Sequence, residues 1–344
     1  MPKTKFNIRN TVKEYFKPIT EAYDVPNTVV EYAVFEAFTA WSNGISKYRE
    51  TNKPFTLKYR DGRSKYQTIS VDGRCFKDGV FYQLNTAHLL SKIFGRTVSK
   101  KEVSAYSVRL SESRKVGTEI LKIIHDKVSG RFYLAIPIDV KPNQSQIHEK
   151  CFVSLDPGVR TFLTYYDSDE WGEYAKNDNK RIRRLFEHHD KVISKAKKCK
   201  DYHKKRRIYK AASRINAKVT NLVADMHRKV ALDLVRRYQV IILPKFETSK
   251  MVRTLPKVVS RTISSLSHFK FRQRLIQKCR EFGSTLVLVG EAYTSKTCGG
   301  CGQLNQTLKS SKVFHCPTCG LQLDRDLNGA RNVLLRALRG TSIL

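Results

Sequence analysis

Residues 298–328 read CGGCGQLNQTLKSSKVFHCPTCGLQLDRDLN, two close cysteine pairs followed directly by acidic residues. Cys298, Cys301, Cys316 and Cys319 have the spacing CxxC-x14-CxxC. Four thiolates at this spacing close a tetrahedral zinc site, with each pair on a tight turn, and the neighbouring glycines favour such turns. The stretch therefore predicts one structural zinc ion in a ribbon at residues 294–322. The alternative is four unrelated reduced cysteines.

The 344-residue chain is strongly basic, with 65 Lys and Arg against 31 Asp and Glu and a formal charge of +34. Such an excess makes sense mainly when a polyanion neutralises it, and nucleic acid is the first candidate. No apolar run approaches the roughly 20 residues of a membrane span. The N-terminus lacks the apolar core of a secretion signal. We therefore expect an intracellular protein with no membrane partner and with reduced cysteines, of which Cys151 belongs to the core.

Apolar patterning divides the chain into a helix, a strand-rich stretch and an alternating region. Residues 26–41 show a broad apolar helical face. Short strands at 55–60, 66–71, 80–84, 119–126 and 131–140, with a helix at 86–94, suggest a barrel or sandwich. Beyond Lys141-Pro142-Asn143 we expect strands at 151–155, 160–169, 240–244 and 285–291, a helical hairpin within 178–237, and helices at 268–282 and 328–338. Strands interleaved with helices indicate an α/β domain.

Three acids fit the metal ligands of a magnesium-dependent nuclease. Two-metal nucleases need clustered oxygen ligands around ions about 4 Å apart, and strand ends in an α/β sheet supply such clusters. Asp156 follows the strand 151–155, Glu291 ends the strand TLVLVG, and Asp326 opens the last helix. Each has a structural alternative: a turn former at Asp156, a surface residue at Glu291 and a helix N-cap at Asp326.

The order of these motifs carries a family resemblance. SLDPGVRTF, a basic insert, a second apolar strand, TSKTCGGCG, FHCPTCG and DRDLNGARN together resemble the TnpB nucleases of bacterial insertion sequences, which share a RuvC (RNase H-like) domain with type V CRISPR effectors. YTSKTC, LPKFETSKMV and DRDLNGARN look closer still to the eukaryotic and viral Fanzor branch. The resemblance covers about residues 27–344. It implies an RNA-guided DNA endonuclease with RuvC aspartates at Asp156 and Asp326. Asp324 is the weaker choice, because relatives with one acid keep the one before x-Asn.

Two departures from the TnpB pattern stand out. TnpB proteins commonly place the catalytic glutamate directly after the second apolar strand, where this chain has Pro244, and proline cannot bind metal. Fanzor-like relatives move the glutamate to the next strand, the position of Glu291. Glu247 is the alternative, but it already lies in a loop. The second departure is that only about 25 residues precede the matched segment, where relatives usually have a larger helical lobe. The lobe is either reduced or truncated.

Basic residues gather in two segments that are candidates for phosphate contact. A solvated helix face is the ordinary explanation, but acids are too scarce here for i,i+4 pairing. Duplexes that are read through their backbone need many Lys and Arg. We expect contacts with an RNA–DNA duplex or the guide scaffold from Lys180, Arg181, Arg183, Arg184, Lys204, Lys205, Arg206 and Arg207 in the insert, and from Lys250 and Arg253 after the second apolar strand.

Together these features predict a mixed α/β protein with a RuvC (RNase H-like) domain at 150–344, which carries the basic helical insert 178–237 and a four-cysteine zinc-ribbon insertion. A reduced helical, recognition-like segment at 1–50 and a β-barrel, wedge-like lobe at 51–145 precede it. The expected partners are guide RNA and target DNA, in a monomeric ribonucleoprotein that is nuclear if the source is eukaryotic or viral and cytoplasmic otherwise.

The expected cofactors are two Mg²⁺ ions and one structural Zn²⁺. In the two-metal mechanism, one Mg²⁺ activates water and the other stabilises the leaving 3′ oxygen. The alternatives are a transposase that also joins strands, and a catalytically impaired remnant that binds RNA and DNA without cutting.

Overall fold

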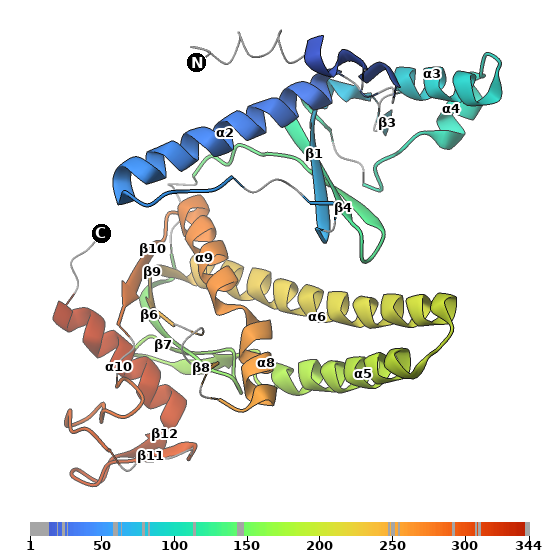
Figure 1. The fold of residues 1–344 in the computed structure, drawn as a ribbon. Helices are drawn as coiled ribbons and strands as arrows, with labels where there is room; N and C mark the ends of the chain where they lie inside the picture. The colour runs from blue at the N-terminus through green and yellow to red at the C-terminus, as the bar shows by residue number, and fades with distance from the viewer. Residues whose placement is uncertain are drawn as a thin grey trace. The chain divides into compact units, whose positions relative to one another are not determined.

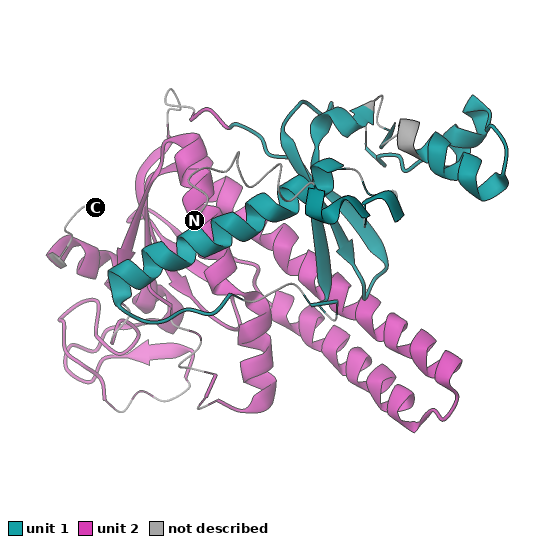
Figure 2. Cartoon of the chain, turned by 45° about the horizontal axis from the view of Figure 1, so that its top comes forward, with its two compact units in different colours: residues 1–139 teal, residues 140–344 magenta. Residues whose placement is uncertain are grey.

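A computed structural model describes residues 14–18, 20–22, 25, 27–57, 61–62, 64–77, 80–81, 83–112, 115–142, 148–246, 248, 252–253, 255–290, 293–306, 308 and 311–340. The chain divides into two compact units, residues 1–139 and 140–344 (Figure 2). Within the described residues, no helix is long and apolar enough to cross a membrane.

The first unit combines a long helix with short antiparallel strands (Figure 1). Its elements are α2 (Asn27–Thr51), β1 (Tyr66–Asp72), a 3-10 turn (Gly73–Cys75), β2 (Phe76–Lys77), β3 (Val80–Phe81), α3 (Gln83–Phe94), α4 (Lys100–Tyr106), β4 (Ile120–Asp126) and β5 (Arg131–Ala135). β4 pairs with both β1 and β5, and β2 pairs with β3. The Ser70 hydroxyl of β1 donates to Glu36 of α2 at 2.5 Å, which ties the helix to the sheet.

Three strand predictions in this unit are wrong in part. The strand expected at 80–84 is confirmed only as β3 (Val80–Phe81), because α3 begins at Gln83. Residues 55–57 form no strand, and the ring of Phe55 instead covers Gly44 of α2. β5 ends at Ala135, because Pro137 has no N–H to continue the ladder. The pairings among the described residues give a three-stranded sheet and a two-stranded ribbon, so the predicted barrel stays a prediction.

The second unit is built on a five-stranded mixed sheet. Its elements are β6 (Lys150–Pro157), β7 (Leu163–Tyr166), β8 (Trp171–Tyr174), α5 (Asp178–Lys198), α6 (Tyr202–Arg237), β9 (Tyr238–Pro244), α8 (Lys257–Leu266), α9 (His268–Phe282), β10 (Thr285–Val289), β11 (Val313–His315), β12 (Gln322–Asp324) and α10 (Arg325–Gly340). The strand order is β10-β9-β6-β7-β8. An antiparallel meander β6-β7-β8 with two parallel strands on the other side of β6 is the RNase H-like arrangement, so the predicted fold class is confirmed.

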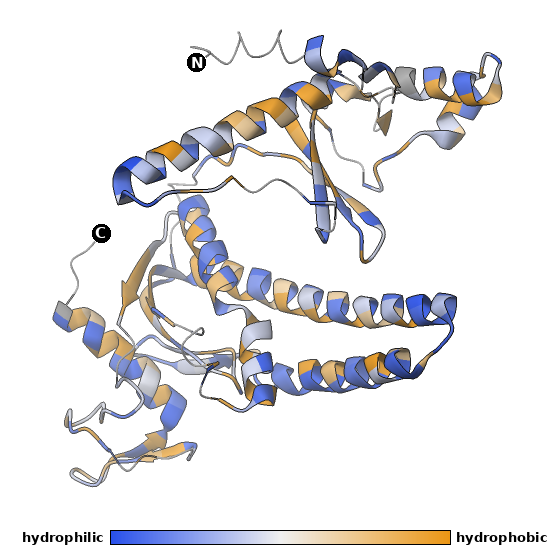
Figure 3. Ribbon diagram, in the orientation of Figure 1, coloured by the Kyte–Doolittle hydropathy of each residue, from blue (hydrophilic) through white to orange (hydrophobic). Residues whose placement is uncertain are grey.

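Side chains along β6 alternate between the two faces of this sheet. Val153 and Leu155 join the core formed with α6 and α9, whereas Phe152 packs in the core formed with α10. Figure 3 shows hydrophobic residues in the strands of this sheet and along α10. Because the side-chain period of a strand is two, Ser154 and Asp156 face α10.

The three parallel strands end at one level. Ser154 pairs with Ile242, so two residues further on Asp156 is level with Pro244, which pairs with Val289 of β10. The carboxyl ends of parallel strands are where α/β sheets place their ligands. This edge, beneath α10, is therefore where a site is expected.

The predicted helical hairpin is confirmed as α5 and α6. The Asp201 carboxylate caps α6 by accepting from the Lys204 N–H at 2.7 Å. The sequence predicted no helix at α8, whereas α9 begins and ends as predicted. Cys151 is exposed at the start of β6, so its predicted core position is wrong.

Candidate active site and cysteine metal centre

Asp156 lies at the end of β6 with its carboxylate against α10. A Cβ added to Gly329 would lie 2.6 Å from the Asp156 Oδ2 atom, so the missing side chain of this glycine makes room for the carboxylate. Gly329 stands three residues after Asp326 on the same helix, and residues at this spacing lie on one face. The fold therefore brings Asp156 within one helical turn of Asp326.

Asp324 and Asp326 differ in what their carboxylates do. The Asp324 Oδ1 atom accepts from the backbone N–H groups of Asp326 (2.8 Å) and Leu327 (3.3 Å). These are the bonds of a helix N-cap. The helix N-cap is therefore Asp324 and not Asp326, for which the sequence left that role open. Asp326 lies inside the first turn of α10.

The surroundings of Asp326 disfavour its ionised carboxylate when no cation is bound. Burial raises the pKa of Asp326 above its ordinary value, and the neighbouring carboxylates of Asp324 and Glu173 raise it further. Arg325 and Arg160 act in the opposite direction without reversing the shift. Partly buried carboxylates without full compensation are suited to a bound cation, and carboxylate oxygens are the ligands that Mg²⁺ prefers.

Glu173 is an acid near this site that the sequence did not single out. Asp156 pairs with Thr164 of β7, and Thr164 pairs with Glu173 of β8, so the three form one row across the face that α10 covers. Glu173 accepts from the Thr161 hydroxyl at 2.7 Å and pairs with Lys176. These partners explain why its pKa is lowered despite burial. Glu173 is therefore anchored by the protein itself.

The two candidate glutamates lie outside the described residues, as does Lys250. Around them, β9 ends at a buried Pro244, and the Lys245 N–H donates to the Val289 carbonyl at 2.9 Å. The position of the usual glutamate is thus filled by a proline at the level of Asp156. The assignments of Glu291 and Glu247 stay predictions.

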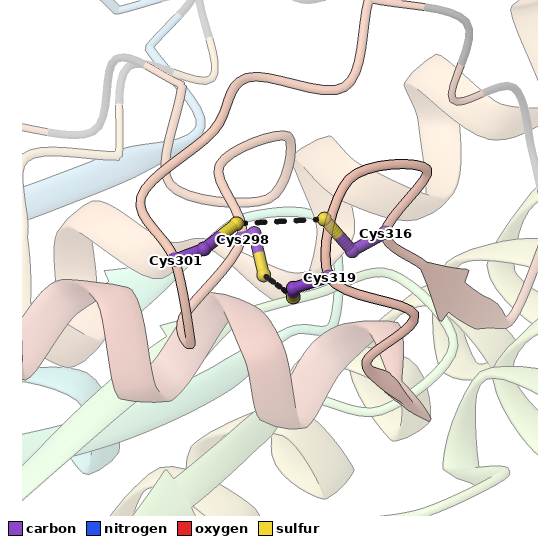
Figure 4. Close-up of side chains that lie close together, drawn as sticks. All are labelled: Cys298, Cys301, Cys316 and Cys319. Atoms are coloured by element: carbon purple, nitrogen blue, oxygen red, sulfur yellow. Dashed lines mark hydrogen bonds between the residues drawn. The ribbon is translucent and has the colours of Figure 1, made fainter.

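The four cysteines form a compact cluster (Figure 4). Their Sγ atoms all lie within 4.8 Å of one another, and two cross-pairs, Cys298–Cys319 and Cys301–Cys316, stand at 3.6 Å. A tetrahedral zinc ion with Zn–S bonds of about 2.3 Å requires S–S separations of about 3.8 Å. The residues therefore fit a tetrahedral metal ion.

Both cysteine pairs sit on the same kind of turn. The Gly302 N–H donates to the Cys298 carbonyl at 3.0 Å, and the Gly320 N–H donates to the Cys316 carbonyl at 3.1 Å. Both glycines have positive φ, 78° and 71°, a conformation that side chains disfavour. N–H groups of residues 319 and 318 lower the pKa of the Cys316 thiol to about 6, which favours the thiolate that binds metal.

Two asparagines of α10 attach the first cysteine turn to the helix, and the sequence alone did not single them out. Asn328 and Asn332 are buried, and both donate to the Thr297 carbonyl, at 2.8 and 2.7 Å. Their i,i+4 spacing was the available signal, since it places both amides on one helix face.

Most of the predicted phosphate contacts are exposed on α5 and α6. Arg183 pairs with Glu187 at 3.2 Å. Among the described residues, the other basic candidates of the hairpin form no ion pair, and Arg253 is exposed before α8. The hairpin candidates without an ion pair are Lys180, Arg181, Arg184, Lys204, Lys205, Arg206 and Arg207. Arg261 of α8, which is not among these candidates, pairs with Asp190 at 2.6 Å and lies over the Phe186 ring.

Comparison with known proteins gives two family matches in chain order. The model described as "Probable transposase" matches residues 135–255, which include β6 to β9. The model described as "Cas12f1-like, TNB domain" matches residues 268–333, from α9 through the cysteine cluster into α10.

Individual relatives agree with these matches. A "TnpB-like protein" of Acanthamoeba polyphaga mimivirus is 27% identical over 325 residues, which cover 90% of this chain and 58% of that protein. A "Putative transposase" of Paramecium bursaria Chlorella virus 1 is 34% identical over 210 residues, covering 61% and 48%. A "Putative RNA-guided DNA endonuclease" of Escherichia coli (strain K12) is 24% identical over 241 residues, covering 66% and 59%. The chain spans less than two thirds of the length of each.

Placement in the Fanzor branch stays a prediction, because the names of these relatives and family models do not distinguish Fanzor proteins from other TnpB-like proteins. The RNase H-like sheet, the four-cysteine cluster before the last helix and the two family matches agree with one another. The matches support the predicted resemblance of this chain to the TnpB proteins.

Proposed function

We propose that this chain acts as a Mg²⁺-dependent, RNA-guided DNA endonuclease in which Asp156 and Asp326 hold the metal ions. The observation that carries the proposal is the contact between the Asp156 carboxylate and Gly329, one turn from Asp326, at the carboxyl edge of the sheet. The name "Putative RNA-guided DNA endonuclease" of a bacterial relative supports the activity and the partners. The cysteine cluster would hold one Zn²⁺ with a structural role.

Each acidic residue has a separate part in this proposal. Asp156 and Asp326 supply hard oxygen ligands, and Glu291 supplies the third carboxylate, since Pro244 offers none. Its place in the sequence supports Glu291, since it follows two residues after Val289, which is level with Pro244 and Asp156. When bound, Mg²⁺ polarises the phosphodiester and makes water a stronger nucleophile. Asp324 remains the helix cap and takes no part in the chemistry.

The basic hairpin supplies the second half of the proposed function. Exposed Lys and Arg along α5 and α6, with few acids to pair with, suit the phosphates of an RNA–DNA duplex or of the guide scaffold. Such contacts hold a duplex by its backbone and carry no sequence information. Sequence selection would then come from the guide.

The test is DNA cleavage by the full chain purified with its co-expressed RNA, in the presence and absence of Mg²⁺. Asp156→Ala and Asp326→Ala should each lower the cleavage rate by about 10³-fold or more. Asp324→Ala is the matched control: it removes a cap worth about 1 kcal/mol and should leave cleavage within about tenfold of the parent. Equal losses in all three variants would contradict the division between cap and metal ligands.

The third ligand is tested in the same assay. Glu291→Ala should abolish cleavage, and Glu247→Ala should not. The reverse result would move the third ligand to Glu247.

A non-cutting, RNA- and DNA-binding remnant is the second candidate, which the proline at position 244 favours. Tight RNA binding without cleavage, with a sequenced guide and permissive flanking DNA, would support the remnant. Products with newly joined strands would instead support a transposase.

A further inference from the structure

We propose that Asn328 and Asn332 form a latch through which metal occupancy of the four-cysteine site fixes the position of Asp326. The proposal rests on the proposed function, in which Asp326 is a ligand of the catalytic metal ions. It assigns a positioning role to two side chains that touch neither metal. The latch is defined as these two amides and the backbone of residues 294–299 that they bind.

The contacts of the latch are buried at Gly299 and Thr294 and partly buried at Thr297. The Asn328 Oδ1 atom accepts from the Gly299 N–H at 3.0 Å, and its Nδ2 donates to the Thr297 carbonyl at 2.8 Å. The Asn332 Nδ2 donates to the carbonyls of Thr294 and Thr297 at 2.8 and 2.7 Å. Asn328 has no exposed surface and Asn332 has 6%. Losing a partner here would leave polar groups buried without hydrogen bonds.

The two asparagines of the latch bind the backbone of the turn that carries Cys298. Thr297 and Gly299 are the residues on either side of Cys298, so the hydrogen bonds go to the backbone of a ligand-bearing segment. The approach is close: a Cβ on Gly299 would lie 3.1 Å from Arg331 Cδ and 3.2 Å from Asn328 Oδ1. Glycine is therefore the residue that lets this turn rest on the helix.

The same helix carries Asp326 between two fixed points. Asp324, at the end of β12 in the cysteine module, caps the helix at its N-terminus. Asn328 holds the helix to the first cysteine turn two residues beyond Asp326. A movement of the first cysteine turn or of Asp324 therefore reaches Asp326 through α10.

The cysteine module (residues 294–324) has only a small hydrophobic core to stabilise its fold without a metal ion. Its buried core is formed by Phe314 with Cys298 and Cys316, packed by three partly buried leucines. Modules of this size commonly fold only around their metal ion. Loss of the ion would free the turn at 297–299, and the latch would lose its partners. Because coupling is reciprocal, a cation at Asp326 should in turn tighten metal binding by the cysteines.

The first experiment is amide hydrogen exchange of residues 325–332 in the full chain, with zinc bound and after removal of zinc by a chelator. Removing zinc should speed exchange in this segment by about tenfold. Asn328→Ala with zinc bound should have a similar effect, and removing zinc from this variant should add little. The non-additivity identifies one shared pathway.

Asn305→Ala is the matched control. Asn305 is also a buried asparagine of the cysteine module, but its amide donates to the His315 carbonyl at 2.9 Å, inside the module. Its replacement should alter exchange in the module and leave residues 325–332 as in the parent chain. If zinc removal from the parent chain leaves α10 exchange unchanged, the latch is excluded, whether or not Asn328→Ala folds.

The second experiment separates the latch from the proposed function. Mn²⁺ affinity is measured by electron paramagnetic resonance for the parent chain, Asp156→Ala and Asn328→Ala, each with and without zinc. Zinc should strengthen Mn²⁺ binding about tenfold in the parent chain and have no effect in Asn328→Ala. If Asp156→Ala binds Mn²⁺ normally, the proposed function fails, and the exchange result still decides the latch. If Mn²⁺ binding is lost in Asp156→Ala but its affinity changes neither with zinc nor in Asn328→Ala, the latch is excluded and the proposed function stands.

Discussion

Lowering the pH from 7 to 5 should destabilise the second unit through two buried histidines beneath the candidate site. His227 and His268 both stack on Phe162, with ring centroids 5.2 and 4.9 Å away. Burial lowers the pKa of each imidazole to about 4. His268 also bonds the backbone of Gly158, two residues after Asp156, and its Nε2 atom has no hydrogen-bond partner.

The sign and size of the effect follow from these pKa values. An unfolded histidine has a pKa of about 6.5, so between pH 6.5 and 4 the unfolded chain binds more protons than the folded one. The stability is fully present above pH 6.5 and is lost as the pH falls through this window. Between pH 7 and 5 each histidine should cost about 2 kcal/mol. The pair then removes about 4 kcal/mol, a large part of the roughly 5–15 kcal/mol that stabilises an ordinary domain.

The assay is urea unfolding at both pH values, followed by tryptophan fluorescence in a Trp41→Phe background. Trp171 of β8 is then the remaining tryptophan, so the signal reports on the second unit. His227→Gln and His268→Gln should each reduce the loss of stability between pH 7 and 5 by about 2 kcal/mol. Metal release from the cysteines at low pH is common to all variants and cancels in this difference.

The control is His188→Gln, a change on the exposed surface of α5 that should keep the parental pH dependence. If both buried-histidine variants also keep it, the two imidazoles are not the groups that titrate. The reasoning from burial would then be refuted.

Three further predictions concern the cysteine ligands, the core of the cysteine module and the basic hairpin. Metal analysis should find one zinc per chain, and Cys316→Ser should lose it and expose residues 298–324 to proteolysis. Phe314→Ala, at the centre of the module, should cost about 3–5 kcal/mol and give the same cleavage pattern by protease. Replacing Lys204, Lys205, Arg206 and Arg207 with Ser should weaken RNA binding. It should also flatten the dependence of log affinity on log salt by about 0.7–0.9 for each phosphate that the variant no longer neutralises, measured by filter binding over a salt series.

The long elements of the second unit could be predicted because their apolar periodicity agrees with their final environment. VIILP and TLVLV are both strongly apolar runs, and both form strands of the sheet: VIILP is mostly buried in β9, and TLVLV forms the partly buried edge strand β10. Residues 268–282 carry a helical period that ends at a glycine with positive φ, so both boundaries were readable. The cysteine spacing likewise predicted a cluster that the structure contains.

Short elements and the directions of individual side chains were harder to predict from the sequence. WGEY is too short for a recognisable period, so β8 was missed, and with it the position of Glu173 in the row beside Asp156. The choice between Asp324 and Asp326 depends on the first residue of α10, and helix starts are poorly defined by pattern alone. In the first unit, the β-rich run at 55–57 packs against α2 rather than pairing, a tertiary preference that overrides local propensity.

The most direct test of the central claim is the position of Mn²⁺ in a structure of the full chain with its co-purified RNA, located by anomalous scattering. We expect an ion within about 2.1 Å of carboxylate oxygens of both Asp156 and Asp326, with Asp324 still bonded to the helix N-terminus. An ion held by Asp324, or no ion at the edge of the sheet where Asp156 meets α10, would contradict the account.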